Sequence, residues 1–189
     1  MTVPEPWLIH FFQRHQDDDP ARPTPTIEFL DGLPDKIAAQ IQAVLEAVAA
    51  APPPSFSGGG KWEAMHDDMA GIYEVRVQGG GANHRLFCLL ERNGDDLGGP
   101  SVVCLGGLTK PVRSAANPRD YSRVRQYADE FRKRRTVHGQ PGSARDRHVQ
   151  RHRARQGDYR RERWVSAARS EQSAHYLRAH PSLPRQLGL

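Results

Sequence analysis

The sequence has little cysteine, and it lacks long apolar runs. Its 2 cysteines, Cys88 and Cys104, are too few for a disulfide framework and show no metal-binding spacing. We expect both to be buried thiols, and a disulfide between them would require that their strands are neighbours. No apolar run is long enough to span a membrane, and residues 1–12 lack the basic start and cleavage site of a signal peptide. These absences indicate a cytoplasmic protein with no membrane partner.

Apolar residues are also scarce, and they are unevenly distributed. They make up 37% of the 189 residues, which is less than most folded domains contain. Residues 136–163 consist mostly of Arg, His, Gln, Gly and Asp and have almost no apolar period. Such a segment cannot bury enough surface to offset the entropy of ordering. We therefore predict one domain over residues 5–135 and a basic, disordered extension over residues 136–189.

The net charge of +5 hides a strong asymmetry along the chain. Residues 1–60 hold 3 basic and 8 acidic side chains, whereas residues 61–135 hold 13 and 10. Residues 136–189 hold 11 basic and 4 acidic side chains. A local excess of positive charge attracts polyanions and raises their local concentration. The second half of the domain and the extension are therefore the parts expected to meet such a partner.

Three elements are predicted in the first 60 residues. A short apolar run over residues 7–14 is typical of a buried strand. A short helix is predicted to begin at Thr24 and Pro25, a pair typical of helix starts. A second helix is predicted over residues 35–50, because its apolar residues recur at helical spacing. These residues share one face of the helix and are Ile37, Ile41, Val44, Leu45 and Val48.

Three strands and a last helix are predicted in the second part of the domain. Residues 71–78, 84–91 and 101–108 are typical of strands, and the turns between them contain Gly79-Gly80-Gly81 and Asn93-Gly94. The last helix is predicted to open at Asn117 and Pro118. The order β-α-α-β-β-β-α indicates an α+β domain. We expect a curved antiparallel sheet with both early helices on one face.

Four short strings, taken in order, resemble the HigB branch of the RelE/ParE toxin superfamily. They are residues 28–34 (EFLDGLP), 71–77 (GIYEVRV), 84–87 (HRLF) and 107–110 (GLTK). The resemblance covers about residues 5–135 and implies a RelE-like fold. It further implies the toxin of a type II toxin–antitoxin system, a ribosome-dependent mRNA endonuclease that inhibits translation. The implied partners are a cognate helix-turn-helix antitoxin, mRNA and the ribosome, with operator DNA contacted only through the antitoxin.

The resemblance also implies a set of site residues. Arg76 and Arg85 match the family's two strand arginines and Lys110 matches a basic residue after the fourth strand, so these three are the expected catalytic residues. The expected substrate-binding residues are Lys61, Glu74, Arg113 and Tyr121. No metal and no cofactor are implied. The chain departs from the pattern at Gly106, where many members have histidine, and at Pro111, where they have a second lysine.

The chemistry can also be argued from the residues. Cleaving RNA through its own 2′-hydroxyl needs an in-line geometry, removal of a proton and stabilisation of an anionic phosphate, and fixed cations supply much of this. A guanidinium group is permanently charged and can hold two phosphate oxygens at once. We expect Arg76 and Arg85 to face the concave side of the sheet, opposite the early helices, which leaves the Arg76 guanidinium group free. A tyrosine or Glu74 would then handle protons.

Two other interpretations stay open at this point. Arg76 and Arg85 could be ordinary strand residues that pair with Glu74 or Glu91. The chain would then be a non-nucleolytic binding module, either a gyrase inhibitor like the ParE relatives or a co-repressor that only binds an antitoxin. Residues 65–69 (MHDDM) are expected to form a polar loop and not a metal site.

Overall fold

The described part of the chain contains five strands and three α-helices. The computed structural model describes residues 6–52, 58–115 and 117–138, and the predicted extension lies outside them from residue 139 onward. The elements, in chain order, are β1 (Leu8–Phe11), α1 (Pro25–Asp31), α2 (Asp35–Ala50), β2 (Trp62–Ala64), β3 (Tyr73–Gly79), β4 (Ala82–Glu91), β5 (Ser101–Pro111) and α3 (Pro118–Arg134). Short 3₁₀ turns lie at Gly58–Gly60, Asp67–Met69 and Asp95–Leu97. The predicted α+β class is confirmed.

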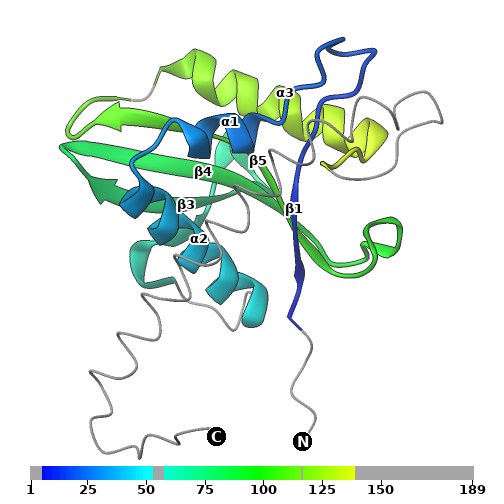
Figure 1. Cartoon of the computed structure of the whole chain (residues 1–189), viewed down its shortest axis with the longest axis horizontal. Coiled ribbons are helices and arrows are strands. Elements are labelled where there is room, and N and C mark those ends of the chain that lie inside the picture. The colour runs from blue at the N-terminus through cyan, green and yellow to red at the C-terminus, as the bar shows by residue number, and fades with distance from the viewer. Residues whose placement is uncertain (1–5, 53–57, 116, 139–189) are drawn as a thin grey trace, which may run out of the picture.

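The strands form one mixed sheet in the order β1-β5-β4-β3-β2. Strands β2 to β5 are antiparallel neighbours, but β1 runs parallel to β5, with Leu8 opposite Ser101. The prediction of an antiparallel sheet was therefore wrong at this edge. A parallel neighbour needs a crossover connection, and here the connection between β1 and β5 contains α1, α2 and the strands β2 to β4. Figure 1 shows β1, in blue, running beside β5.

Strand β2 was not predicted from the sequence. It has 3 residues and pairs with β3, with Trp62 opposite Val75 and Glu63 opposite Glu74. Three residues are too few to produce a clear alternation of apolar and polar positions. The observed order is therefore β-α-α-β-β-β-β-α, with one strand more than expected.

Helices α1 and α2 pack on one face of the sheet, as predicted. All five apolar residues predicted for the buried face of α2 are buried, and Ile41, Leu45 and Val48 have no exposed surface. They belong to one core with strand residues such as Val75 and Leu86. The spacing of apolar residues along α2 was therefore sufficient to predict which of its faces is covered.

The two cysteines lie in this same core. Cys88 on β4 is opposite Cys104 on β5, both are free and without exposed surface, and their Sγ atoms are 3.8 Å apart. Burial is the main cause that raises the pKa of the Cys88 thiol above its ordinary value, and the contact with Cys104 raises this pKa further. The prediction of buried thiols is confirmed.

Helix α3 covers the other face of the sheet. It begins at Pro118 after Asn117, whose side chain accepts a hydrogen bond from the Arg119 N–H. Its buried residues are Val124, Ala128 and Phe131. The rings of Phe131 and Phe12 meet edge-on, with centroids 6.4 Å apart, and neither residue has exposed surface. In Figure 1 the strands run between α3, at the top, and α2, below.

The packed chain continues beyond the end of α3. Val137 is buried and forms an isolated β-bridge with Phe12. Arg135, in the left-handed region with φ 52°, donates hydrogen bonds to Asp96 and Glu91. The bond to Asp96 raises the pKa of Arg135 and lowers that of Asp96. The fold therefore reaches at least Val137, two residues beyond the predicted domain end.

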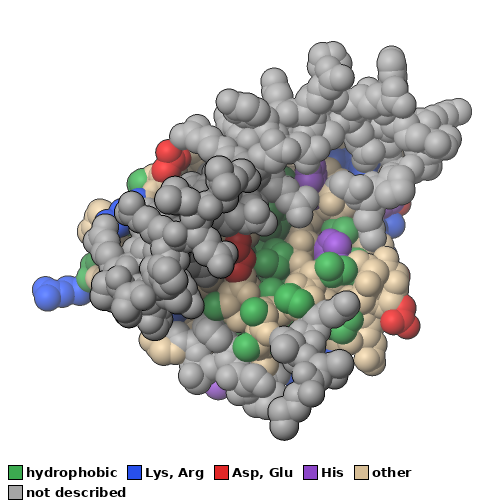
Figure 2. All heavy atoms as spheres, turned by 60° about the horizontal axis from the view of Figure 1, so that its bottom comes forward, with side chains coloured by type: hydrophobic (Ala, Val, Ile, Leu, Met, Phe, Trp, Pro, Cys, Tyr) green, Lys and Arg blue, Asp and Glu red, His purple; other side chains and the backbone are tan. Residues whose placement is uncertain are grey.

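Apolar surface is visible on one side of the molecule. Figure 2 looks at the side that lies at the bottom of Figure 1 and shows hydrophobic side chains gathered near its middle. Among the described residues, the exposed large hydrophobic side chains are Leu8 and Val112. No helix in the described ranges is long and apolar enough to cross a membrane.

Candidate functional site

Strands β3 and β4 place two arginines directly opposite each other. The strands are antiparallel, with Val75 opposite Leu86 and Arg76 opposite Arg85. Side chains alternate between the two faces of a strand. Since Val75 and Leu86 lie in the core shared with α2, both arginines lie on the face opposite α1 and α2. Glycine at the tip of the hairpin allows the tight reversal, because Gly80 and Gly81 have φ of 59° and 76°.

A buried carboxylate, that of Glu74, joins the two arginines. Glu74 has no exposed surface. Its Oε1 accepts a hydrogen bond of 2.5 Å from Arg76 Nε, and its Oε2 accepts one of 3.0 Å from Arg85 Nη1. A buried carboxylate is stable only when it is paired, so this arrangement holds both guanidinium groups in place. The expectation of a free Arg76 guanidinium group was therefore wrong, because Glu74, two residues earlier on the same face of β3, accepts a hydrogen bond from it.

The two arginines differ in which of their guanidinium nitrogens are still available to a ligand. Arg76 places Nε and Nη2 on Glu74, and its Nη1 lies 2.5 Å from Glu63 Oε2. Arg85 uses only Nη1, which donates to Glu74 and to the Tyr121 hydroxyl. Within the described ranges, Nη2 of Arg85 has no hydrogen-bond partner and its buried Nε has none either. Arg85 therefore keeps a nitrogen without a carboxylate partner for a ligand, whereas every guanidinium nitrogen of Arg76 already faces a carboxylate.

Tyr121 completes this group from the first turn of α3. Its hydroxyl accepts a hydrogen bond of 3.2 Å from Arg85 Nη1, and its ring meets Phe87 edge-on with centroids 5.9 Å apart. The capped start of α3 thus holds a half-buried phenol against a permanently charged group. A hydroxyl in this position can donate to an anion or transfer a proton. We call Glu63, Glu74, Arg76, Arg85 and Tyr121 the arginine cluster.

The remaining predicted site residues are not members of the arginine cluster. Lys61 is exposed and its carbonyl accepts a hydrogen bond of 2.8 Å from the Arg76 N–H. Lys110 lies on β5, and its Nζ donates to the Ser114 carbonyl at 2.6 Å. Arg113 is exposed, with φ 69°, and makes no hydrogen bond or ion pair within the described ranges. The structure thus links Lys61 to the cluster through the backbone and leaves Lys110 and Arg113 outside it.

Glu63 is the member of the cluster that the sequence did not reveal. It lies opposite Glu74 on β2 and reaches Arg76 from the neighbouring strand. The signal was weak, because it depends on treating residues 62–64 as a strand. In that case burial of Trp62 in the core would require Glu63 to point to the opposite face, where the arginines lie.

Glu74 was expected to contact the substrate directly. The structure instead places it below the surface, with both carboxylate oxygens engaged by arginines. A ligand at the surface would therefore meet the guanidinium groups that Glu74 orients. Its role in the cluster is that of a positioning residue.

A β-bulge lies where the family pattern has histidine. The pairing of β4 with β5 shifts between Phe87 and Cys88, and Gly106 adopts φ 146° at this point. A Cβ atom at position 106 would lie 3.1 Å from the Pro25 Cβ. A larger side chain is therefore disfavoured by both the backbone and the available space. Pro111, the other departure, is the last residue of β5.

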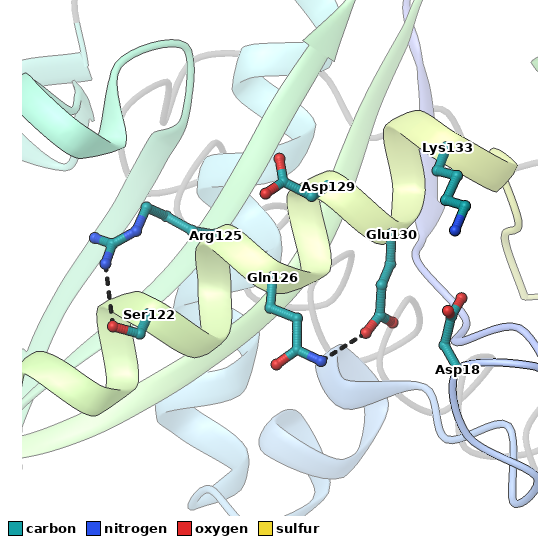
Figure 3. A pocket seen from close by; sticks show the side chains of 7 residues that line it. All are labelled: Asp18, Ser122, Arg125, Gln126, Asp129, Glu130 and Lys133. Carbon is teal, nitrogen blue, oxygen red and sulfur yellow. Dashed lines mark hydrogen bonds between the residues drawn. The ribbon is translucent and has the colours of Figure 1, made fainter.

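A shallow, open hollow of about 540 Å³ lies elsewhere, along α3. Figure 3 shows that most of its side chains come from α3 and that Asp18 comes from the loop beside it. The lining is formed by Asp18, Ser122, Arg125, Gln126, Asp129, Glu130 and Lys133. Its charges are mixed, and its three carboxylates are paired with arginines. A hydrogen bond from Arg134, for example, lowers the pKa of Asp18. The hollow is therefore a weaker candidate site than the arginine cluster.

The described ranges contain no candidate metal site. No three His, Cys, Asp or Glu side chains among those residues are grouped so that they could hold a metal ion. The residues that approach one another most closely at the candidate site are instead arginines and carboxylates.

Comparisons with known proteins add a distant structural likeness. No protein-family model matches the chain, and no curated protein matches it. Among solved structures, the chain is similar to one from the crystal structure of the toxin–antitoxin complex RelBE2 from Mycobacterium tuberculosis. The identity is 16%, the match covers 56% of this chain and 99% of that chain, and the TM-score is 0.37. A likeness this distant carries no argument about activity.

Proposed function

We propose that this chain is a HigB-type toxin of a type II toxin–antitoxin system, working in the cytoplasm as a metal-independent, ribosome-dependent mRNA endonuclease. The observation that carries the proposal is the paired placement of Arg76 and Arg85 on adjacent strands, oriented by one buried carboxylate. Preorganised cations stabilise developing charge without reorganising during the reaction. The strings that resemble the HigB branch supply the toxin and antitoxin parts of the proposal.

The reaction proposed for the site is transesterification. The 2′-hydroxyl of one nucleotide gives up its proton as its oxygen attacks the adjacent phosphorus. The bond from phosphorus to the 5′-oxygen of the next nucleotide breaks and that oxygen takes up a proton, which leaves a 2′,3′-cyclic phosphate and a 5′-hydroxyl. Arg85 carries the main charge stabilisation, because its Nη2 has no acceptor among the described residues. Tyr121, whose hydroxyl lies 3.2 Å from Arg85 Nη1, is the candidate for proton transfer.

The other basic residues would bind the flanking RNA. Lys61 is exposed beside Arg76, and Lys110 and Arg113 extend the positive charge along β5 and the loop that follows. Cations that contact phosphates away from the scissile bond raise affinity without sequence preference. The cognate helix-turn-helix antitoxin would neutralise the toxin and would carry any contact with operator DNA.

The proposal is tested by induced expression followed by mapping of transcript 5′ ends. Wild-type protein should produce new 5′ ends within translated reading frames, and Arg85→Lys at matched expression should lose most of them. Blocking translation initiation on a reporter transcript should remove its cuts if the ribosome is required. Growth arrest without new 5′ ends would contradict the nuclease assignment.

A second candidate function is a non-nucleolytic binding module. The observation that favours it is charge balance, because the two arginines of the cluster face two carboxylates, Glu63 and Glu74. A balanced network can serve structure alone. Such a module would inhibit DNA gyrase or act as an antitoxin-binding co-repressor. DNA damage without transcript cuts would favour gyrase inhibition, and absence of toxicity together with antitoxin binding would favour the co-repressor.

A further inference from the structure

Two carboxylates contact Arg76, and they differ sharply in exposure. Glu74 is fully buried, whereas the side chain of Glu63 is 43% exposed and that of Arg76 is 38% exposed. The two carboxylates lie on paired positions of β2 and β3. Arg76 is therefore held by one fixed group inside the fold and by a second group that can move into solvent.

We propose that Glu63 is an internal competitor for the phosphate groups of single-stranded RNA at Arg76. In the free protein its carboxylate occupies Arg76 Nη1 at 2.5 Å, and a phosphate of the bound RNA displaces it. This inference rests on the proposed function, because it assigns Arg76 to substrate binding. Glu63 then sets the affinity of the site for RNA without touching the reacting atoms.

The difference in burial between Glu63 and Glu74 decides which carboxylate leaves Arg76 when a phosphate binds. An ion pair in water is weak, because solvent screens it and ordering two long side chains costs entropy. Releasing Glu74 would leave a buried charge unpaired, which is far more costly. A phosphate offers Arg76 the same kind of charge-assisted hydrogen bond as the departing carboxylate. Exchange at Nη1 is therefore easy, whereas exchange at Nε is not.

Displacement also changes the charge of the cluster. With Glu63 in place, two guanidinium groups face two carboxylates. Once Glu63 has moved away, Glu74 alone balances Arg76 and Arg85, and one net positive charge appears where the phosphate binds. Arg85 Nη2, which has no acceptor in the described ranges, lies on the opposing strand position. Two neighbouring cations can then share the phosphates of one RNA strand.

Equilibrium binding of the full chain to a 2′-O-methyl RNA oligonucleotide tests the inference. This probe cannot be cut, because its 2′-oxygen is blocked, so affinity is measured apart from cleavage. Glu63→Gln should bind about 2–5-fold more tightly than wild type, which is the scale of an exposed ion pair. The matched control is Asp129→Asn, which removes an exposed carboxylate paired with Arg132 at 3.1 Å and makes the same change in net charge.

A second pair of variants separates this inference from the proposed function. In an Arg76→Ala background, Glu63→Gln should give no gain in affinity, because the group for which it competes is gone. A gain that persists there, or an equal gain from Asp129→Asn, would overturn the inference. If Arg76→Ala with Arg85→Ala, compared per folded molecule, weakens binding while Glu63→Gln changes nothing, only the role of Glu63 fails. If that double variant binds RNA as well as wild type, the proposed site fails too.

Discussion

The two faces of the sheet are built from the same alternating strands but carry different chemistry. The face under α2 is mostly apolar along β3 and β4, with Val75 and Leu86 in its core and the buried polar residue His84 near the hairpin end. The face under α3 is apolar around Phe87 and becomes charged at Arg85 and Arg76. A face with a continuous core stabilises the fold, whereas a face that changes character along its strands can also present charged groups. The α3 face therefore combines packing with a candidate site.

This difference is sharpest around Glu74. It lies opposite Phe87 in the sheet, so one buried carboxylate neighbours an aromatic core residue and two arginines. On the α2 face the corresponding interior positions hold hydrophobic residues. Burial of a charge is tolerated here because both partners are present, and this requirement ties the arginines to the fold. Substitutions on the two faces should therefore have separable effects on stability and on activity.

The largest effect is expected from the α2 face. Leu45→Ala should lower the free energy of unfolding by about 2–5 kcal/mol, because it leaves a cavity in a fully packed core. Urea unfolding followed by circular dichroism would measure the change. Gln40→Ala, on the exposed side of the same helix, should change stability by no more than about 0.5 kcal/mol. Equal losses from both variants would contradict the assignment of the buried face.

The next largest effect is expected on RNA cleavage, from substitutions in the arginine cluster. Arg85→Ala should lower RNA cleavage by ~10²–10³, the scale seen when one transition-state donor is removed. Arg85→Lys should also lose most activity, because an ammonium cannot reproduce the planar fork, although it keeps a cation beside Glu74 and so preserves folding better. Rates are compared per folded molecule. Full toxicity of the double Arg76→Ala, Arg85→Ala variant at matched expression would reject the site.

An intermediate loss of stability is expected when the folded unit is shortened at its C-terminal end, on the α3 face of the sheet. A chain that ends after residue 135 loses Val137, which is buried and bridged to Phe12. It should therefore be less stable by about 1.5–3 kcal/mol than a chain that ends after residue 138. The longer of the two should fold and be as toxic as the full chain. If it proves harmless at equal expression, the extension belongs to the working unit.

The smallest effect is expected from an exposed ion pair on the loop before β5. The hydrogen bond from Arg135 lowers the pKa of Asp96, so the folded state favours the ionised form. This contribution is present at neutral pH and is lost as the pH falls below about 4. Asp96→Asn should lower stability at pH 7 by up to about 1 kcal/mol and by less at pH 3. Asp95→Asn is the control, and an equal pH-dependent loss from it would contradict the assignment.

The helices and the main strands could be predicted because their signals are local. The α2 residues recur at helical spacing, and Pro118 after Asn117 marks the start of α3. Strand β2 was missed because three residues carry no period, and Glu63 was missed with it. The parallel placement of β1 was missed because partners in a sheet are set by contacts between distant segments.

The sequence by itself determined which residues alternate to each face, and therefore that Arg76 and Arg85 lie opposite the α2 core. Periodicity depends only on residues that are close in the sequence, so it can be recognised without knowledge of the fold. Only the tertiary structure decided that Glu74 is buried between the arginines, that Glu63 reaches Arg76 and that Tyr121 reaches Arg85. These contacts join separate strands and a helix, and their strength depends on burial, which no local pattern encodes.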